Sequence, residues 1–278
     1  MKNLQRGRGV LVLLGVGAVL AAGCSGRATY PKAKLAGAVT SVLAGEGITA
    51  HVRALEHTVA VQLAYPNALS QQGPQITIGP AFDEATRKSI MSLHKVLLST
   101  DADIRFYVVL LSDPKTPGAY LTIVRYLDDV RRANANMLDT PEIFARTVFE
   151  LNAAGPLPIN LDQYLPHDIT LEEFLSWQLA RRIQRQLTEQ LQPQGMARVG
   201  LCAGVFQNRE FAFTLDVAPS AAASLDEATI QQVFQTATNE IAKVLGGYRF
   251  DSFDQVRLIH PLTGRNFVLP KARLNLFR

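Results

Sequence analysis

The sequence predicts an α+β protein made of two similar units, each with the order helix, strand, strand, helix, strand, strand. A short segment, Phe-Asp-Glu-Ala-Thr at 82–86, recurs as Leu-Asp-Glu-Ala-Thr at 225–229. A helical hydrophobic pattern begins at each copy, and short strand-like apolar runs lie on both sides of it. The distance between the copies is that of a domain, so the pattern indicates a duplicated unit rather than a short repeat.

The first unit is predicted over 34–152. Its opening helix carries Leu35, Val39 and Leu43 on one face, which is the spacing of an amphipathic helix. Its last helix has Thr140 as a cap and Pro141 at the first helical position. The predicted elements are helix 34–44, strands 48–54 and 58–64, a helix starting at 82, strands 104–111 and 120–126, and helix 140–152.

The second unit is predicted over 170–278. Thr170 and Glu173 have the spacing of a capping box, and Ser224 and Glu227 have the same spacing before the later helix. The predicted elements are helix 171–191, strands 198–206 and 210–217, a helix starting at 225, and strands 255–259, 266–268 and 273–277.

Short turns join neighbouring strands, and such strands pair antiparallel. We therefore expect each unit to be an antiparallel sheet packed by two helices. The alternative is one larger α+β domain in which the similarity between the halves is a coincidence.

A proline-rich linker is predicted between the units, over 153–169. Three Pro and one Gly fall within 153–167, a composition that disfavours regular structure. The linker also has apolar side chains, so we expect it to pack against the protein. These are Leu157, Ile159, Leu161, Tyr164 and Leu165.

The N-terminus has the composition of a secretory signal peptide. Lys2, Arg6 and Arg8 precede an apolar run over 10–22, and small residues follow before Cys24. A transmembrane helix needs roughly 20 apolar residues, more than this run provides. The ending Leu-Ala-Ala-Gly-Cys resembles the lipobox of bacterial lipoproteins.

That resemblance implies cleavage of a signal peptide, 1–23, and acylation of the sulfur and the amine of Cys24. Residues 24–33 are then expected to be a tether. In lipoproteins of two-membrane bacteria, Asp directly after the Cys favours retention in the inner membrane, and here the residue is Ser25. The resemblance implies the periplasmic face of the outer membrane, or the outer face of the cell membrane in a single-membrane host.

The charge balance gives no support for a nucleic-acid partner. The chain has 28 Lys+Arg and 24 Asp+Glu, but three of the basic residues lie in 1–23, so the mature chain is close to neutral. Arg181, Arg182 and Arg185 are interspersed with glutamates on one predicted helix, which is typical of a solvated helix face.

Cys202 is the second of the two cysteines and lies in an apolar, strand-like run. With Cys24 acylated, no intramolecular disulfide can form, and we expect Cys202 to be a small buried apolar side chain.

The sequence contains no motif of a hydrolase, a phosphate-binding loop or a zinc site, so we predict no catalytic, cofactor-binding or metal-ligating residue. His51 and His57 are candidate metal ligands on two neighbouring predicted strands, but the sequence shows no third ligand beside them. For an enzyme, the starting points are Asp101 and Asp103 before a strand and Asp128 and Asp129 after one. Turn capping and surface ion pairs are the favoured explanation of these carboxylates.

Three functions are open at this point. The first is a membrane-anchored, non-enzymatic binding or assembly module in the cell envelope, with an envelope protein or polymer as partner. The second is a carboxylate-based hydrolase or transferase that works at a cleft between the units. The third is a carrier of a hydrophobic ligand, which requires a large apolar cavity.

Overall fold

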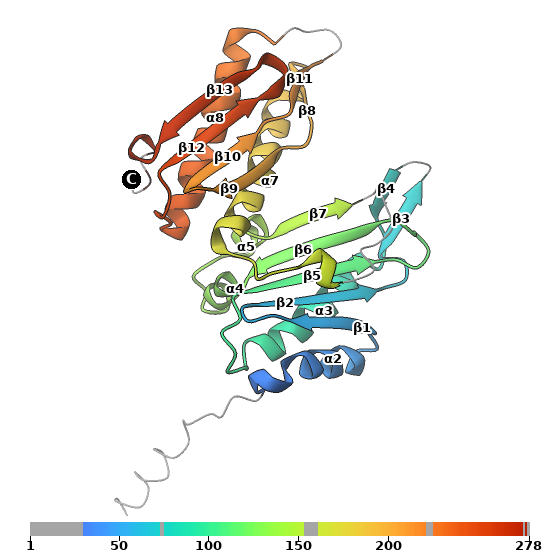
Figure 1. Ribbon diagram of the computed structural model, residues 1–278. Helices are drawn as coiled ribbons and strands as arrows, with labels where there is room; N and C mark the ends of the chain where they lie inside the picture. The colour runs from blue at the N-terminus through green and yellow to red at the C-terminus, as the bar shows by residue number, and fades with distance from the viewer. Residues whose placement is uncertain (1–29, 73–74, 153–160, 221–224, 275, 277–278) are drawn as a thin grey trace, which may run out of the picture.

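The chain forms two α+β layers joined by one long helix, which confirms the predicted α+β class (Figure 1). The computed structural model describes residues 30–278 except 73–74, 153–160, 221–224, 275 and 277–278. Helix α7 (Leu171–Leu191) runs from the first layer into the second (Figure 1).

The first layer contains a five-stranded sheet with the order β1-β2-β5-β6-β7. One face is covered by helices α2 (Leu35–Gly45) and α3 (Phe82–Leu97). The strands are β1 (Ala50–Ala54), β2 (Thr58–Ala64), β5 (Phe106–Ser112), β6 (Tyr120–Tyr126) and β7 (Val148–Asn152).

The second face of this sheet is also covered, by the C-terminal part of the predicted linker and the start of α7. Leu161, Leu165 and Ile169 are buried there, and Phe174 of α7 packs beside them. The prediction that the linker packs on the protein is therefore confirmed for these residues. Its first part, 153–160, lies outside the described residues. One helical turn, α6 (Leu161–Tyr164), forms where irregular structure was predicted.

The second layer contains a four-stranded sheet with the order β13-β12-β10-β9. Helices α7 and α8 (Glu227–Tyr248) cover one face of it and enclose the larger core cluster. The strands are β9 (Ala203–Gln207), β10 (Glu210–Thr214), β12 (Gln255–His260) and β13 (Arg265–Pro270), with β8 (Ala197–Val199) and β11 (Val217–Pro219) as a separate pair.

The prediction that each sheet is wholly antiparallel is wrong. The short-turn hairpins pair antiparallel as expected, but β2 runs parallel to β5, and β10 runs parallel to β12. Helices α3 and α8 lie between the members of these two pairs, and a helical crossover returns the chain in the same direction. Both sheets share this order of directions, while duplication of the unit stays a prediction.

The predicted helix over 140–152 is wrong in its second half. Helix α5 (Thr140–Ala145) is short, and the chain then forms β7, which pairs with β6. The edge of the sheet supplies hydrogen bonds that outweigh the weak helical pattern of this segment. A hairpin of β3 (Leu69–Gln72) and β4 (Gln75–Ile78) and a helix, α4 (Leu127–Asn134), were not predicted.

The two predicted capping boxes have different outcomes. Thr170 and Glu173 form the box, each accepting from the backbone N–H of the other. At the later helix the N-cap is Asp226, whose carboxylate accepts from the N–H of Thr229 at 2.8 Å, while Ser224 lies outside the described residues.

The predicted last strand, 273–277, is also wrong at its beginning. Residues Lys271–Arg273 form the 3₁₀ turn η3, while 275 and 277–278 lie outside the described residues.

The first described residue, Tyr30, lies within the predicted tether. Tyr30 bridges to Thr100, and 3₁₀ turn η1 (Lys32–Lys34) leads into α2. The signal peptide, 1–23, and Cys24 lie outside the described residues. Within the described part of the chain, no helix has both the length and the apolar character needed to cross a bilayer.

Candidate functional site

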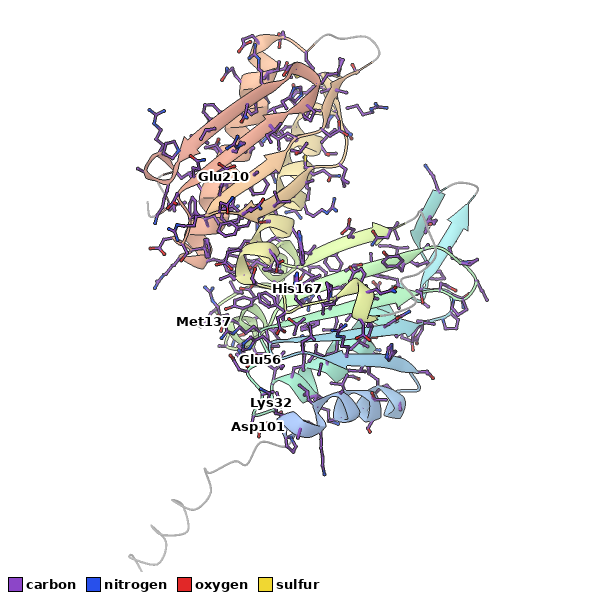
Figure 2. The ribbon with its side chains drawn as sticks, in the orientation of Figure 1. Lys32, Glu56, Asp101, Met137, His167 and Glu210 are labelled. Atoms are coloured by element: carbon purple, nitrogen blue, oxygen red, sulfur yellow. The ribbon has the colours of Figure 1, made fainter. Side chains whose placement is uncertain are left out.

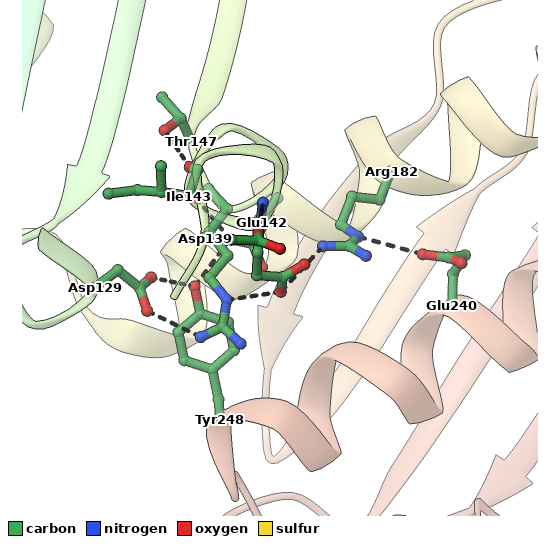
Figure 3. A network of polar contacts seen from close by, with 10 residues as sticks. Asp129, Asp139, Glu142, Ile143, Thr147, Arg182, Glu240 and Tyr248 are labelled. Atoms are coloured by element: carbon green, nitrogen blue, oxygen red, sulfur yellow. Dashed lines mark hydrogen bonds and ion pairs between the residues drawn. The ribbon is translucent and has the colours of Figure 1, made fainter. Parts of the chain in front are cut away.

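A buried polar network, which we call the inter-unit network, joins the two layers (Figure 3). Its centre is Asp129, in the first turn of α4, where the helix N-terminus favours a carboxylate. Tyr248, the last residue of α8, donates its hydroxyl to Asp129 Oδ2 at 2.5 Å. Arg146 Nη1 donates to Asp129 Oδ1 at 2.9 Å. Both carboxylate oxygens are therefore engaged by protein donors.

Further contacts extend the inter-unit network into α7. The Arg146 Nε donates to Glu142 Oε1 at 2.8 Å, and its guanidinium lies 4.6 Å from the centre of the Tyr248 ring. Gln178 of α7 donates its amide N–H groups to the Arg146 carbonyl at 2.7 Å and to Tyr248 Oη at 3.0 Å. Another arginine, Arg182 of α7, pairs with Glu240 of α8 at 3.2 Å.

Burial controls the electrostatics of this network. It raises the pKa of Asp129, against the hydrogen bonds from Tyr248 and Arg146 that lower it. Burial, followed by the Asp129 charge, also raises the pKa of Tyr248, so the phenol stays a neutral donor. Asp129 and Arg146 are 3% and 7% exposed, which makes the network a structural joint between the layers.

The other three candidate carboxylates make no contact with the inter-unit network that the structure records. Asp101 accepts the backbone N–H of Lys32 at 2.6 Å, at the end of the first layer away from the second (Figure 2). Asp103 pairs with Arg105 at 2.9 Å, and the Arg105 hydrogen bond lowers its pKa. Asp128 lies half-buried in the first turn of α4. Asp101 and Asp103 therefore serve local structural contacts.

The histidine candidates are not brought together as ligands. His51 lies on β1 opposite Gln62 of β2, whereas the His57 ring contacts the carbonyl of Asp103 at 2.9 Å. Among the described residues, no group of three His, Cys, Asp or Glu side chains has an arrangement that could hold a metal ion.

A cavity of about 440 Å³, which we call the inter-unit cavity, lies between the second face of the first sheet and the α7–β9 side of the second layer. Most of its wall is apolar, and none of the four candidate carboxylates is part of it. The wall comprises Val108, Thr122, Val124, Val148, Glu150, Tyr164, Leu165, Ile169, Trp177, Ala180, Arg181, Leu201, Cys202, Ala203 and Gly204.

Few polar side chains line the inter-unit cavity, and they occur in two pairs. Arg181 of α7 forms an ion pair with Glu150 of β7 at 2.7 Å. The hydroxyls of Tyr164 and Thr122 are 3.0 Å apart, and burial raises the pKa of Tyr164 to about 12. The cavity thus combines one charged pair and one neutral hydroxyl pair with an apolar wall.

The second layer contributes both exposed and buried side chains to the cavity. Trp177 and Leu201 are 37% and 58% exposed, whereas Cys202 is buried, as predicted. Burial raises the pKa of Cys202 to about 11, so its thiol stays protonated. Gly204 lets α7 lie directly on β9, because a Cβ there would approach the Ser176 carbonyl oxygen to 2.4 Å.

The sequence singled out Asp129 and suggested a cleft between the units, but it revealed neither the partners of Asp129 nor the residues of the cavity wall. Tyr248 and Asp129 are 119 residues apart, and no local pattern connects them. In comparisons with known proteins, no family model matches the chain and no curated protein sequence is significantly similar to it. The functional argument therefore depends on the geometry of the chain itself.

Proposed function

We propose that this chain is a lipid-anchored, non-enzymatic binding module of the bacterial cell envelope. The observation that carries the proposal is the inter-unit cavity, whose wall is mainly apolar and contains none of Asp101, Asp103, Asp128 and Asp129. Ligand pockets typically have an apolar wall with a few placed polar groups. A carboxylate-based reaction would need its acid and base to face such a site.

The N-terminal segment supports the anchor. Its lipobox-like ending at Cys24 implies acyl chains that attach the protein to a membrane. The proposed location is the periplasmic face of the outer membrane, or the outer face of the cell membrane in a single-membrane host. An envelope protein or polymer is the proposed macromolecular partner, and the near-neutral charge does not favour nucleic acid.

Membrane fractionation with the Cys24→Ala variant tests the anchor. The wild-type chain should fractionate with membranes, and its mature N-terminus should carry the mass of an acylated cysteine. The Cys24→Ala variant should lose both properties, while the control Cys202→Ala should keep them. A wild-type chain that retains residues 1–23, or that is soluble with an unmodified Cys24, would contradict the proposal.

Complementation tests the binding role against the hydrolase or transferase alternative. A strain that lacks the protein is supplied with a chain carrying Asp101→Ala, Asp103→Ala, Asp128→Ala and Asp129→Asn. The amide is used at position 129 because it retains hydrogen bonds in the inter-unit network. Full complementation is expected for a binding module. Loss of complementation by a chain that is folded and membrane-bound would favour the enzyme.

A further inference from the structure

We infer that the inter-unit cavity binds the hydrocarbon chain of a single-chain amphiphile whose anionic headgroup lies at Arg181. This inference deepens the proposed function, since it names the class of ligand that the module takes. It uses a cavity that the described residues form between the two layers, together with the charged pair on its wall.

The wall of the inter-unit cavity suits a hydrocarbon. Val108, Val124 and Val148 are at most 3% exposed and come from three neighbouring strands of the first sheet. Leu165 and Ile169 close this side, and both are at most 5% exposed. A ligand chain in the cavity packs against these side chains and removes the more exposed apolar surface of Trp177 and Leu201 from water, which is the favourable term in such binding.

The same wall disfavours a peptide segment. A peptide brings an N–H and a C=O at every residue, and each costs free energy if it is buried without a partner. The polar groups on the wall are grouped in two pairs, Arg181–Glu150 and Tyr164–Thr122, rather than spread along it. A hydrocarbon with one polar end fits this distribution better.

The volume is appropriate for one chain. The cavity of about 440 Å³ falls within the range of small-molecule pockets. A group the size of a water molecule occupies about 30 Å³, so the space corresponds to on the order of 15 such groups. This is the size of one long acyl chain.

The charge on the wall selects the headgroup. A guanidinium offers five N–H donors, and Glu150 and Gln184 take one each from Arg181 at 2.7 and 3.3 Å. Its side chain is 26% exposed, so the ion pair is accessible from solvent. Because Glu150 has the same charge as such a headgroup, a ligand carboxylate or phosphate binds Arg181 by replacing Glu150 at the guanidinium, which commonly pairs with these anions. The exposed Trp177 and Leu201 provide an apolar lip for entry of the chain.

The only tryptophan of the chain makes the test direct, because it lies on the wall of this cavity. The full chain with Cys24→Ser, which removes the lipid attachment, is titrated with brominated palmitate and, separately, with brominated lysophosphatidylglycerol. We expect saturable quenching of Trp177 fluorescence by at least one of the two. The tighter ligand identifies the source as a free fatty acid or a lysolipid.

Two variants show whether the chain occupies the cavity. Ala180→Phe fills it and should weaken binding at least tenfold, while Ala44→Phe, at an exposed position of α2, should bind as the parent does. If Ala180→Phe does not fold, Arg181→Gln serves instead and should weaken binding of the anionic ligands several-fold.

Absence of saturable quenching by both ligands in a folded chain would overturn the inference. Equal affinities of the parent, Ala180→Phe and Arg181→Gln would do the same. Neither result would affect the proposed anchor, which is measured separately by fractionation with Cys24→Ala.

Discussion

The two sheets have the same order of strand directions, but they differ in what covers their second face. In the first layer, helices cover one face and residues 161–174 cover the other, so all seven residues of β5 are buried. In the second layer, the described residues cover only one face, and buried and half-buried residues alternate along β12. The same order of strand directions therefore occurs in one sheet whose central strand is buried on both faces and in another whose central strand is buried on one face.

The sequence of each central strand records this difference. β5 reads Phe-Tyr-Val-Val-Leu-Leu-Ser, a continuous apolar run, as is typical of strands that are buried on both faces. β12 reads Gln-Val-Arg-Leu-Ile-His, and its inward side chains are Val256, Leu258 and His260. Alternation of this kind indicates that one face meets solvent.

The uncovered face of the second sheet is held by polar contacts between strands. Glu210 of β10 pairs with Arg257 of β12 at 2.7 Å and also accepts from Gln255 (Figure 2). The hydrogen bond from Arg257 lowers the pKa of Glu210. Such contacts leave polar side chains on the solvent-facing surface of the sheet. They contribute little to the free energy of unfolding, in contrast to the inter-unit network.

The largest expected effect comes from the inter-unit network. Arg146→Met removes the cation beside the buried Asp129 and should lower the free energy of unfolding by about 3–5 kcal/mol. Arg257→Met, on the uncovered face, should shift the thermal midpoint by less than about 1 °C. Urea and thermal unfolding measure both. If the two variants lowered the thermal midpoint equally, the inter-unit network would not contribute more to stability than the ion pair on the uncovered face.

A smaller effect is expected on the second faces of the two sheets. Val108→Ala in β5 should lower the free energy of unfolding by about 2 kcal/mol, since Val108 is 1% exposed and its truncation removes buried apolar contacts and enlarges the inter-unit cavity. Val205→Ala in β9, where Val205 is 60% exposed, should cost less than about 0.5 kcal/mol. Urea unfolding of the two variants decides whether the covered face is packed as described.

Acid should destabilise the first layer through His94 of α3, whose Nε2 contacts Tyr107 Oη at 2.8 Å. Burial, followed by the charge of Arg125, lowers the pKa of His94 to about 4. The unfolded chain binds a proton near pH 6.5 and the folded chain only near 4, so stability falls as the pH drops through this window, by up to about 3 kcal/mol.

His94→Gln should flatten this part of the stability curve, measured by urea unfolding at several pH values. Its stability at pH 8 provides the reference for any change that is unrelated to protonation. A curve as steep as that of the wild type would assign the acid sensitivity to other groups.

The smallest effect distinguishes the two copies of the Asp-Glu-Ala-Thr segment. Asp226 caps α8, so Asp226→Ala should lower the thermal midpoint by about 2–4 °C. Asp83 lies inside α3, whose N-cap is Ala81, so Asp83→Ala should lower it by less than about 1 °C. Similar shifts would indicate that the two aspartates act alike.

The α+β class and most hairpin strands could be predicted because local patterns encode them. The spans 58–64, 120–126 and 171–191 match β2, β6 and α7. The strand β7 was missed because its stability comes from pairing with β6, which no local pattern reveals. The parallel pairs were missed for a related reason, since the crossing helix rather than a turn sets the direction.

The candidate site was harder to predict than the fold. Asp129 was singled out from the sequence, but its partners Arg146 and Tyr248 lie in other elements and gave no common signal. The inter-unit cavity depends on how α7 and β9 approach the first sheet. Gly204 was a weak clue, because a glycine in a strand permits close backbone approach.

Helix α7 has a consequence for how the molecule melts. Phe174 and Leu175 are consecutive residues, yet the first packs into the cluster on the first sheet and the second into the core of the other layer. Neither layer can lose its packing without disturbing the same helix. Calorimetry should therefore record one endotherm, and the whole structure should behave as a single cooperative unit despite its two sheets.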